Sequence, residues 1–136
     1  MPYLALLLLL LCAPLQAQNL VVSRVVSIYD ADTFRVDING WPPIIGSNMP
    51  IRVLGVDAPE IRGKCADEKA KALEAKAITV NSLRNAQTIE LRNIKRGKYF
   101  RLLADIYVDG KSLAALLISS GLARPYDGGK REGWCE

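Results

Sequence analysis

Alternating apolar and polar residues mark segments that we expect to form β-strands. In DTFRVDI, for example, Phe34, Val36 and Ile38 fall on one face and polar side chains on the other. One further strand is unusual because it carries a charged side chain, Arg52, on the face that it shares with Leu54. The pattern predicts five short strands, over residues 20–29, 32–38, 51–56, 86–94 and 101–108.

Two other segments have the three- and four-residue spacing of helices. Within residues 65–84 this spacing predicts a core-facing stripe made of Ala66, Ala70, Leu73, Ala77, Val80 and Arg84. A second helix is expected from a cap at Ser112 through Ser120, ended by Gly121, with three leucines facing inward: Leu113, Leu116 and Leu117. Residues 39–50 contain Asn-Gly and three prolines, which predict a loop or a wide hairpin.

This order of elements predicts an α+β fold. One helix interrupts the strands between the third and the fourth, and another follows the fifth. A small five-stranded, partly open barrel of the OB type, with two to three packed helices, accommodates that order. The pattern contains no internal repeat and no linker, so we expect one domain over residues 18–136.

The first seventeen residues differ from the rest and predict a cleaved secretory signal peptide. Residues 4–15 form an apolar run of twelve, which suits the hydrophobic part of such a signal and is too short for a membrane span of about 20 residues. Cys12 could alternatively carry a lipid anchor, but Leu11 is large where lipoprotein signals have a small residue. We therefore expect a secreted or periplasmic protein.

Composition narrows the possible chemistry. The formal net charge is +4 and the pI is about 9.1, which favours a polyanionic partner, although basic charge also serves solubility alone. The chain has no histidine, which excludes Ser-His-Asp and Cys-His catalysis and histidine-ligated zinc. Beyond the leader only Cys65 and Cys135 remain, and in an oxidising compartment they predict one disulfide, the alternative being two unrelated thiols.

Carboxylates follow two of the expected strands. Asp30 and Asp32 lie between the first two strands, and Asp57 and Glu60 follow the third. Aspartate is common in turns because its side chain bonds the backbone, and we assign Asp30 to that role. For Asp32 and Asp57 the spacing leaves two interpretations open: turn residues, or ligands of a calcium ion.

Two arginines next to apolar residues are the second candidate feature. Arg52 and Arg101 each present a planar, permanently charged fork that matches a phosphate group. Two such forks opposite a cation could surround a phosphodiester. Taken singly, each arginine is better explained by a surface salt bridge.

Several sequence segments, taken in order, resemble the staphylococcal nuclease (thermonuclease) family: DADTF, IRVLGVDAPE, GKYFR, ADIYVDG and LISSGLARPYDG. The similarity extends from Val21 to Trp134. It implies an OB barrel with helices that cleaves phosphodiester bonds of DNA and RNA with Ca²⁺ and leaves 3′-phosphate ends. Single-stranded substrates and a monomeric protein are expected.

The resemblance also implies roles for individual residues. The calcium ligands would be two carboxylates and one backbone carbonyl, from Asp32, Asp57 and Ala58. Glu60 would hold the attacking water, and the scissile phosphate would be bound by Arg52 and Arg101. A neighbouring phosphate would be contacted by Lys98 and Tyr99.

Two local departures from the family pattern need a structure to interpret. The family has a glycine where this chain has Ala31, and alanine would be strained if the backbone there had positive φ. Phe100 stands where the family has a glycine immediately before the arginine, so the placement of Arg101 could differ from the family pattern. The alternative functions are a non-catalytic OB module that binds single-stranded nucleic acid, and a structural domain held by its disulfide.

Overall fold

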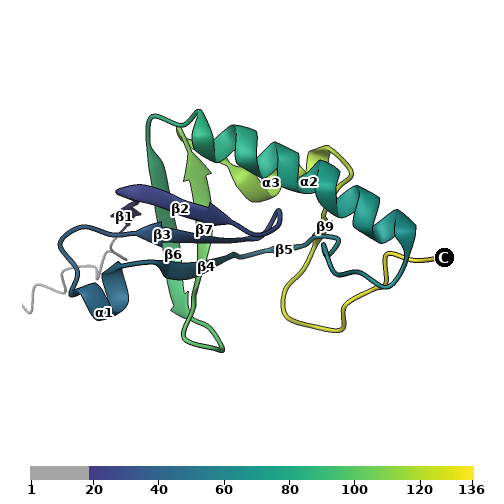
Figure 1. Cartoon of the computed structure of the whole chain (residues 1–136), viewed down its shortest axis with the longest axis horizontal. Coiled ribbons are helices and arrows are strands. Elements are labelled where there is room, and N and C mark those ends of the chain that lie inside the picture. Colours follow the sequence, from purple (N-terminus) through teal and green to yellow (C-terminus); the bar gives the residue numbers. More distant parts are fainter. Residues whose placement is uncertain (1–18) are drawn as a thin grey trace, which may run out of the picture.

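The structure, a computed structural model, describes residues 19–136; the expected signal peptide of residues 1–17 lies outside the described residues. Figure 1 shows a curled sheet with a long helix lying across it. Five longer strands build the sheet: β2 (Arg24–Ile28), β3 (Thr33–Asp37), β4 (Met49–Val53), β6 (Ile89–Arg96) and β7 (Leu102–Val108). Among residues 19–136, no helix is long and apolar enough to span a membrane.

The order of the strands explains how distant segments meet. β2, β3 and β4 form an antiparallel meander, β6 and β7 form a hairpin, and parallel pairing of β4 with β7 joins the two units. Two short strands extend this sheet, β1 (Leu20–Val21) beside β6 and β8 (Lys111–Ser112) beside β7. Apolar side chains fill the inner face, including Phe34, Val36, Ile51 and Leu91. The predicted α+β, OB-like architecture is confirmed as a curled half-barrel with three helices.

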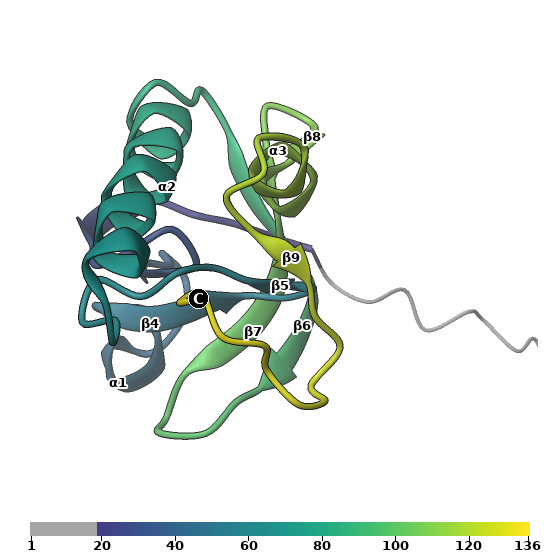
Figure 2. The ribbon, with the colours of Figure 1, turned by 90° about the vertical axis from the view of Figure 1, so that its right-hand side faces the viewer.

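Two predicted strands are divided in the structure. The segment 20–29 is split between β1 and β2, and the segment 51–56 is split by a turn at Leu54 and Gly55. Gly55 has a φ of 82°, a conformation that favours glycine. Beyond this turn, β5 (Val56–Asp57) pairs with β9 (Arg124–Pro125), so the C-terminal part of the chain lies against the end of the barrel, as Figure 2 shows.

The long helix α2 (Ala66–Arg84) has the predicted bounds, but the predicted core-facing stripe is wrong. Leu73 of that stripe is 61% exposed. The residues that are buried form a different stripe: Glu68, Ala72, Ala75, Thr79 and Leu83. Because the helix is rich in alanine, its apolar pattern is weak, and two polar side chains that bond neighbouring loops help to decide which face is buried.

The other two helices are short. α3 (Leu113–Ser119) starts as predicted, with the Ser112 hydroxyl accepting a hydrogen bond from the Ala115 amide. Leu113 and Leu117 are buried, whereas Leu116 is 45% exposed and the prediction that it faces inward is wrong. So short a helix buries only one pair of residues spaced by four, and it lies against both β7 and α2. The segment predicted as loop 39–50 contains the one-turn helix α1 (Pro43–Gly46) and the start of β4.

Candidate active site

The turn between β2 and β3 presents two aspartates at one end of the barrel. The amides of Tyr29 and Asp30 both donate to the Thr33 carbonyl, at 3.0 and 3.3 Å, which closes the turn. Ala31 is fully buried, and its carbonyl accepts a 2.7 Å hydrogen bond from the Thr79 hydroxyl of α2. Ala31 does not have positive φ, so alanine is not strained there. The helix therefore fixes the aspartate-bearing turn directly.

Arg52 is paired across neighbouring strands. Thr33 of β3 lies opposite Arg52 of β4, which brings the arginine beside Asp32. Its Nη1 donates to Asp32 Oδ2 at 2.9 Å, and its Nη2 donates to the Val56 carbonyl at 3.4 Å. Because Asp32 is 3% exposed and the Arg52 side chain 17% exposed, this is a shielded pair rather than a surface salt bridge.

The loop that follows β5 is positioned by a glutamate from α2. The Glu68 carboxylate accepts hydrogen bonds from the Glu60 amide at 3.3 Å and from the Lys64 amide at 2.9 Å. The same loop passes so close to Glu68 that a Cβ on Gly63 would come within 2.4 Å of its side chain. Glu60 itself is exposed, so a buried carboxylate holds its backbone while its own carboxylate remains accessible.

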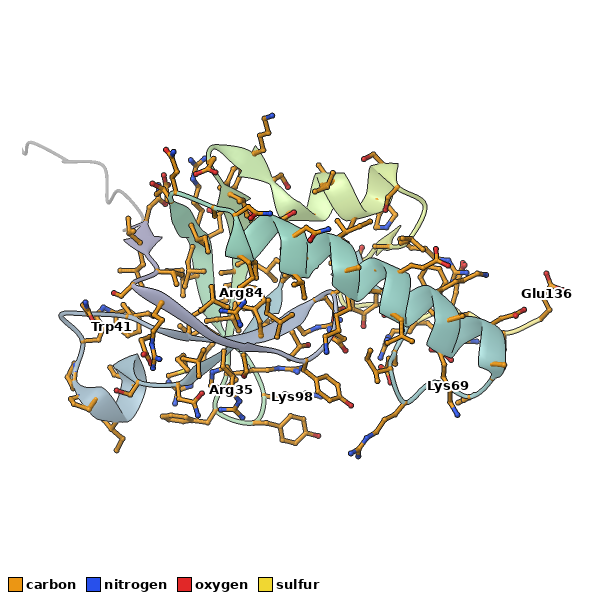
Figure 3. The ribbon with its side chains drawn as sticks, turned by 45° about the horizontal axis from the view of Figure 1, so that its top comes forward. Arg35, Trp41, Lys69, Arg84, Lys98 and Glu136 are labelled. Carbon is orange, nitrogen blue, oxygen red and sulfur yellow. A yellow bond between two sulfur atoms is a disulfide. The ribbon has the colours of Figure 1, made fainter. Side chains whose placement is uncertain are left out.

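Arg101 reaches the site from the turn between β6 and β7. Tyr99 and Phe100 both adopt positive φ, 59° and 53°, and the Gly97 amide bonds the Arg101 carbonyl at 2.8 Å. This turn keeps Arg101 in the site despite the substitution at Phe100. Within residues 19–136, the Arg101 Nε is one of two buried side-chain polar atoms that lack a hydrogen-bond partner. Figure 3 shows Lys98 on the same turn.

These segments surround one cavity of about 630 Å³ at the end of the barrel. Five of the predicted site residues line it: Asp32, Arg52, Glu60, Lys98 and Arg101. Three do not. Asp57 and Ala58 are buried outside the lining, and Tyr99 is 87% exposed on the turn. The cavity thus brings together acids and cations from four separate parts of the chain.

Asp57 is covered by the C-terminal tail, which we define as residues 126–136. Arg131 Nε donates to Asp57 Oδ1 at 2.7 Å, and Arg131 Nη1 donates to Glu60 Oε1 at 2.7 Å. The indole Nε1 of Trp134 donates to the other Asp57 oxygen at 3.2 Å. Two of the predicted acids are therefore joined by one guanidinium group. The sequence pattern does not predict this contact.

The disulfide prediction is confirmed: Cys65 and Cys135 are bonded. The bond ties the tail to the residue that caps α2. In Figure 3, Glu136 lies beyond the end of α2 that carries Lys69.

Two ionisable groups in the site have strongly altered proton affinity. Burial, followed by the negative charge of Asp32, raises the pKa of Asp30 from 3.8 to about 7. Burial acts to lower the pKa of Arg131, but its hydrogen bonds to Glu60 and Asp57 and their charges outweigh that effect and raise it. Arg131 is thus a permanent cation, while the raised pKa means that Asp30 gains or loses its proton near neutrality.

The donor set suits a hard cation such as calcium, which prefers carboxylate and carbonyl oxygens. Asp30 Oδ1 is buried without a hydrogen-bond partner beside Asp32, so it offers a further oxygen that fits a cation. Within the described part of the chain, however, a single group of three possible metal ligands has its ligand atoms within 4.8 Å of one another. It consists of Cys65, Glu68 and Cys135, and the two cysteine sulfurs are already bonded to each other. The proposed calcium carboxylates are instead held by Arg52 and Arg131.

Comparison with known families agrees with this geometry. The family model described as "Staphylococcal nuclease homologue" matches residues 50–133, more than half of the chain. The chain belongs to the staphylococcal nuclease family. The match includes β4, β5, α2, the β6–β7 hairpin and most of the tail.

Two curated relatives of this staphylococcal nuclease homologue come from Bacillus subtilis (strain 168). Endonuclease YncB is 34% identical over 115 residues, which cover 78% of this chain and 47% of the relative. The SPbeta prophage-derived endonuclease YokF is 35% identical over 104 residues, which cover 70% of this chain and 31% of the relative. The chain spans less than half the length of either relative.

Sequence reasoning missed three functional candidates in this family member: Glu68, Arg131 and Trp134. From the sequence alone, Arg131 is either a solvated tail charge or one that follows a nucleic-acid backbone. One signal could have located it. Cys65 follows Glu60 by five residues and Cys135 follows Arg131 by four, so a disulfide between the cysteines brings the two charged residues together.

Proposed function

We propose that this protein is an exported, calcium-dependent endonuclease that hydrolyses phosphodiester bonds of DNA and RNA and leaves 3′-phosphate ends. One observation carries the proposal: a single cavity is lined both by Arg52, Arg101 and Lys98 and by Asp32 and Glu60. A site that only binds nucleic acid gains nothing from carboxylates, because they repel phosphate. Family membership and the two relatives named as endonucleases support the same activity.

In the proposed reaction, two cations of the protein bind the scissile phosphate. Arg101 lines the cavity and forms no salt bridge among residues 19–136, so its guanidinium group can bind a phosphate without first breaking an ion pair. Arg52 lines the same cavity while Nη1 bonds Asp32 and Nη2 makes a long bond to the Val56 carbonyl, so its position is fixed. Both charges become more valuable as negative charge grows on the phosphorus oxygens in the transition state.

Glu60 orients the attacking water and accepts its proton. Arg131 bonds one of the Glu60 oxygens, but the Glu60 side chain is 48% exposed and its backbone is fixed by Glu68, which suits a group that must hold a small molecule in a set direction. Lys98 contacts an adjacent phosphate, and the exposed ring of Tyr99 offers a surface for an unpaired base, which favours single-stranded substrates.

The carboxylates of Asp32 and Asp57 and the carbonyl of Ala58 would hold the calcium ion. When bound, the ion supplies positive charge that reduces repulsion between the phosphodiester and its nucleophile. Asp30 lies beside Asp32 with an unpartnered oxygen, so it would offer a further oxygen to the ion.

Export is proposed from the apolar leader, and the Cys65–Cys135 bond supports it because such bonds persist in oxidising compartments. A monomer is proposed as the working unit.

The test is to incubate the purified chain, without residues 1–17, with single-stranded DNA and single-stranded RNA, in calcium and in chelator. Calcium-dependent shortening with 3′-phosphate ends supports the proposal. Retention of intact strands on the protein would instead favour the binding module. The specific argument for that module is that Arg131 neutralises Asp57 and Glu60, which reduces their repulsion of phosphate. If the protein neither cleaves nor binds the strands, the structural domain held by its disulfide is the remaining function.

A further inference from the structure

The tail returns to the site along a path that is fixed at both ends. After β9, the Tyr126 amide bonds the Gly55 carbonyl at 2.9 Å, and the Tyr126 hydroxyl bonds the Gly129 carbonyl at 2.9 Å, which closes a compact loop. The chain then returns to Asp57, which bonds Arg131 and Trp134, and Figure 2 shows this yellow segment looping back from β9 toward β5. It ends at the disulfide with Cys65.

The segment around Arg131 is held by contacts on both sides. Arg124 Nη1 donates to the carbonyls of Glu132 and Gly133, at 3.3 and 2.8 Å, and its guanidinium group lies 3.9 Å from the ring centre of Trp134. Trp134 is 9% exposed and bonds Asp57. Cys135, which follows Trp134, is bonded to Cys65. The backbone that carries Arg131 is therefore held on both sides of the contact with the acids.

The charge of Arg131 neutralises two acids, one of which, Asp57, is a proposed calcium ligand. Its guanidinium group joins Asp57 Oδ1 to Glu60 Oε1. The Asp57 side chain is only 4% exposed, so its charge has to be compensated by a nearby cation. The Arg131 side chain is 40% exposed and lies at the rim of the cavity, so it can move into solvent if another cation takes over Asp57.

We propose that the disulfide-tethered tail is a built-in competitor of calcium: Arg131 and the metal ion alternate on Asp57, and Arg131 releases Glu60 when the ion binds. The inference rests on the proposed function, because it takes Asp57 as a calcium ligand. Tethering makes the competition intramolecular, so Arg131 acts at a high effective concentration whatever the protein concentration. If the tail-bound state is populated to about 90%, apparent calcium affinity falls about tenfold.

The disulfide makes this competition sensitive to reductants. A dithiol breaks the Cys65–Cys135 bond, supplies two electrons and two protons to form two thiols, and becomes a disulfide itself. The tail then loses its anchor at Cys135 and keeps only its non-covalent contacts. Arg131 should dissociate more readily, and calcium should bind more tightly.

The test measures calcium binding by titration calorimetry, a readout that does not depend on catalysis. Arg131→Gln removes the competing charge, and Lys130→Gln is the matched control, since Lys130 is exposed, adjacent, and forms no salt bridge in the described structure. We expect Arg131→Gln to lower the calcium dissociation constant about tenfold and Lys130→Gln to change it less than about twofold. Dithiol treatment of the unmodified chain and the Cys65→Ser/Cys135→Ser double variant should both tighten binding.

A second measurement follows the tail itself. Amide hydrogen exchange over residues 126–134 should become faster when calcium is added to the oxidised protein, because Arg131 and Trp134 give up Asp57. Equal calcium affinity of Arg131→Gln and the unmodified chain, with exchange unchanged, overturns the competition while leaving the proposed function intact. Absence of calcium binding in every variant overturns the proposed function together with the competition.

Discussion

Replacing Asp30 by asparagine should stabilise the metal-free protein at alkaline pH, against the usual cost of changing a buried residue. Asp30 is 6% exposed, and within residues 19–136 its Oδ1 lacks a hydrogen-bond partner. Burial and the nearby Asp32 charge raise its pKa from 3.8 to about 7. A difference of about three pKa units corresponds to at most about 4 kcal/mol of unfolding free energy lost once the group is ionised.

The sign follows from proton binding. In the unfolded chain Asp30 loses its proton near pH 3.8, whereas in the folded protein it keeps the proton up to about pH 7. Between these values the folded state binds more protons, so the unfolding free energy falls as pH rises through this window and then levels off. Asparagine has nearly the same shape and does not ionise, so the variant lacks this fall.

The assay is urea unfolding in chelator, from about pH 4 to about pH 8, of the unmodified chain and of Asp30→Asn. The stability difference should grow across this range in favour of the variant. Asp67→Asn, which neutralises an exposed aspartate at the start of α2, controls for the loss of one negative charge. A difference between Asp30→Asn and the unmodified chain that stays constant over the whole range would refute the reasoning.

Three further substitutions test how the site is supported. Thr79→Val keeps the side-chain shape but removes the bond to the Ala31 carbonyl, and should lower the unfolding free energy by about 1–3 kcal/mol in urea unfolding. Glu68→Gln removes one of the acceptors that position the Glu60 loop, and it should slow DNA cleavage about ten- to hundredfold in a rate assay. A loss of stability without slower cleavage would count against this role. Cys65→Ser/Cys135→Ser removes a bond between residues 70 apart and should lower the unfolding free energy by about 4 kcal/mol, measured by thermal or urea unfolding. A loss near zero would contradict the chain-entropy argument.

Much of the site could be predicted because it is built from strand pairing and strand ends. The alternation over residues 32–38 correctly places Phe34, Val36 and Ile38 in the core, which leaves Thr33 facing the opposite side beside Arg52. The unexpected charge in the third strand is explained by its partner: Arg52 bonds Asp32. Antiparallel pairing of neighbouring strands is local enough for sequence reasoning to anticipate it.

The contacts that were missed depend on packing over long distances in the sequence. Arg131 meets Asp57 across 74 residues, and no periodicity in the tail indicates that contact. Thr79 and Glu68 were hidden by the alanine-rich helix, in which the apolar pattern predicts the wrong face. Asp30 was assigned to an ordinary turn, but it is buried with an unpartnered oxygen in a turn that Thr79 of α2 holds through Ala31, a contact across 48 residues.

The central claim is that one cavity uses arginines, carboxylates and calcium to cleave a phosphodiester. The most direct measurement compares the rate of cleavage of a single-stranded oligonucleotide by the unmodified chain and by Arg101→Ala, in calcium and in chelator. Arg101 forms no salt bridge in the described structure and its Nε has no partner, so its removal should leave the melting temperature nearly unchanged. The account predicts cleavage only in calcium and a rate about 10²–10³-fold lower in Arg101→Ala. Equal rates in both proteins, or full cleavage in chelator, would contradict it.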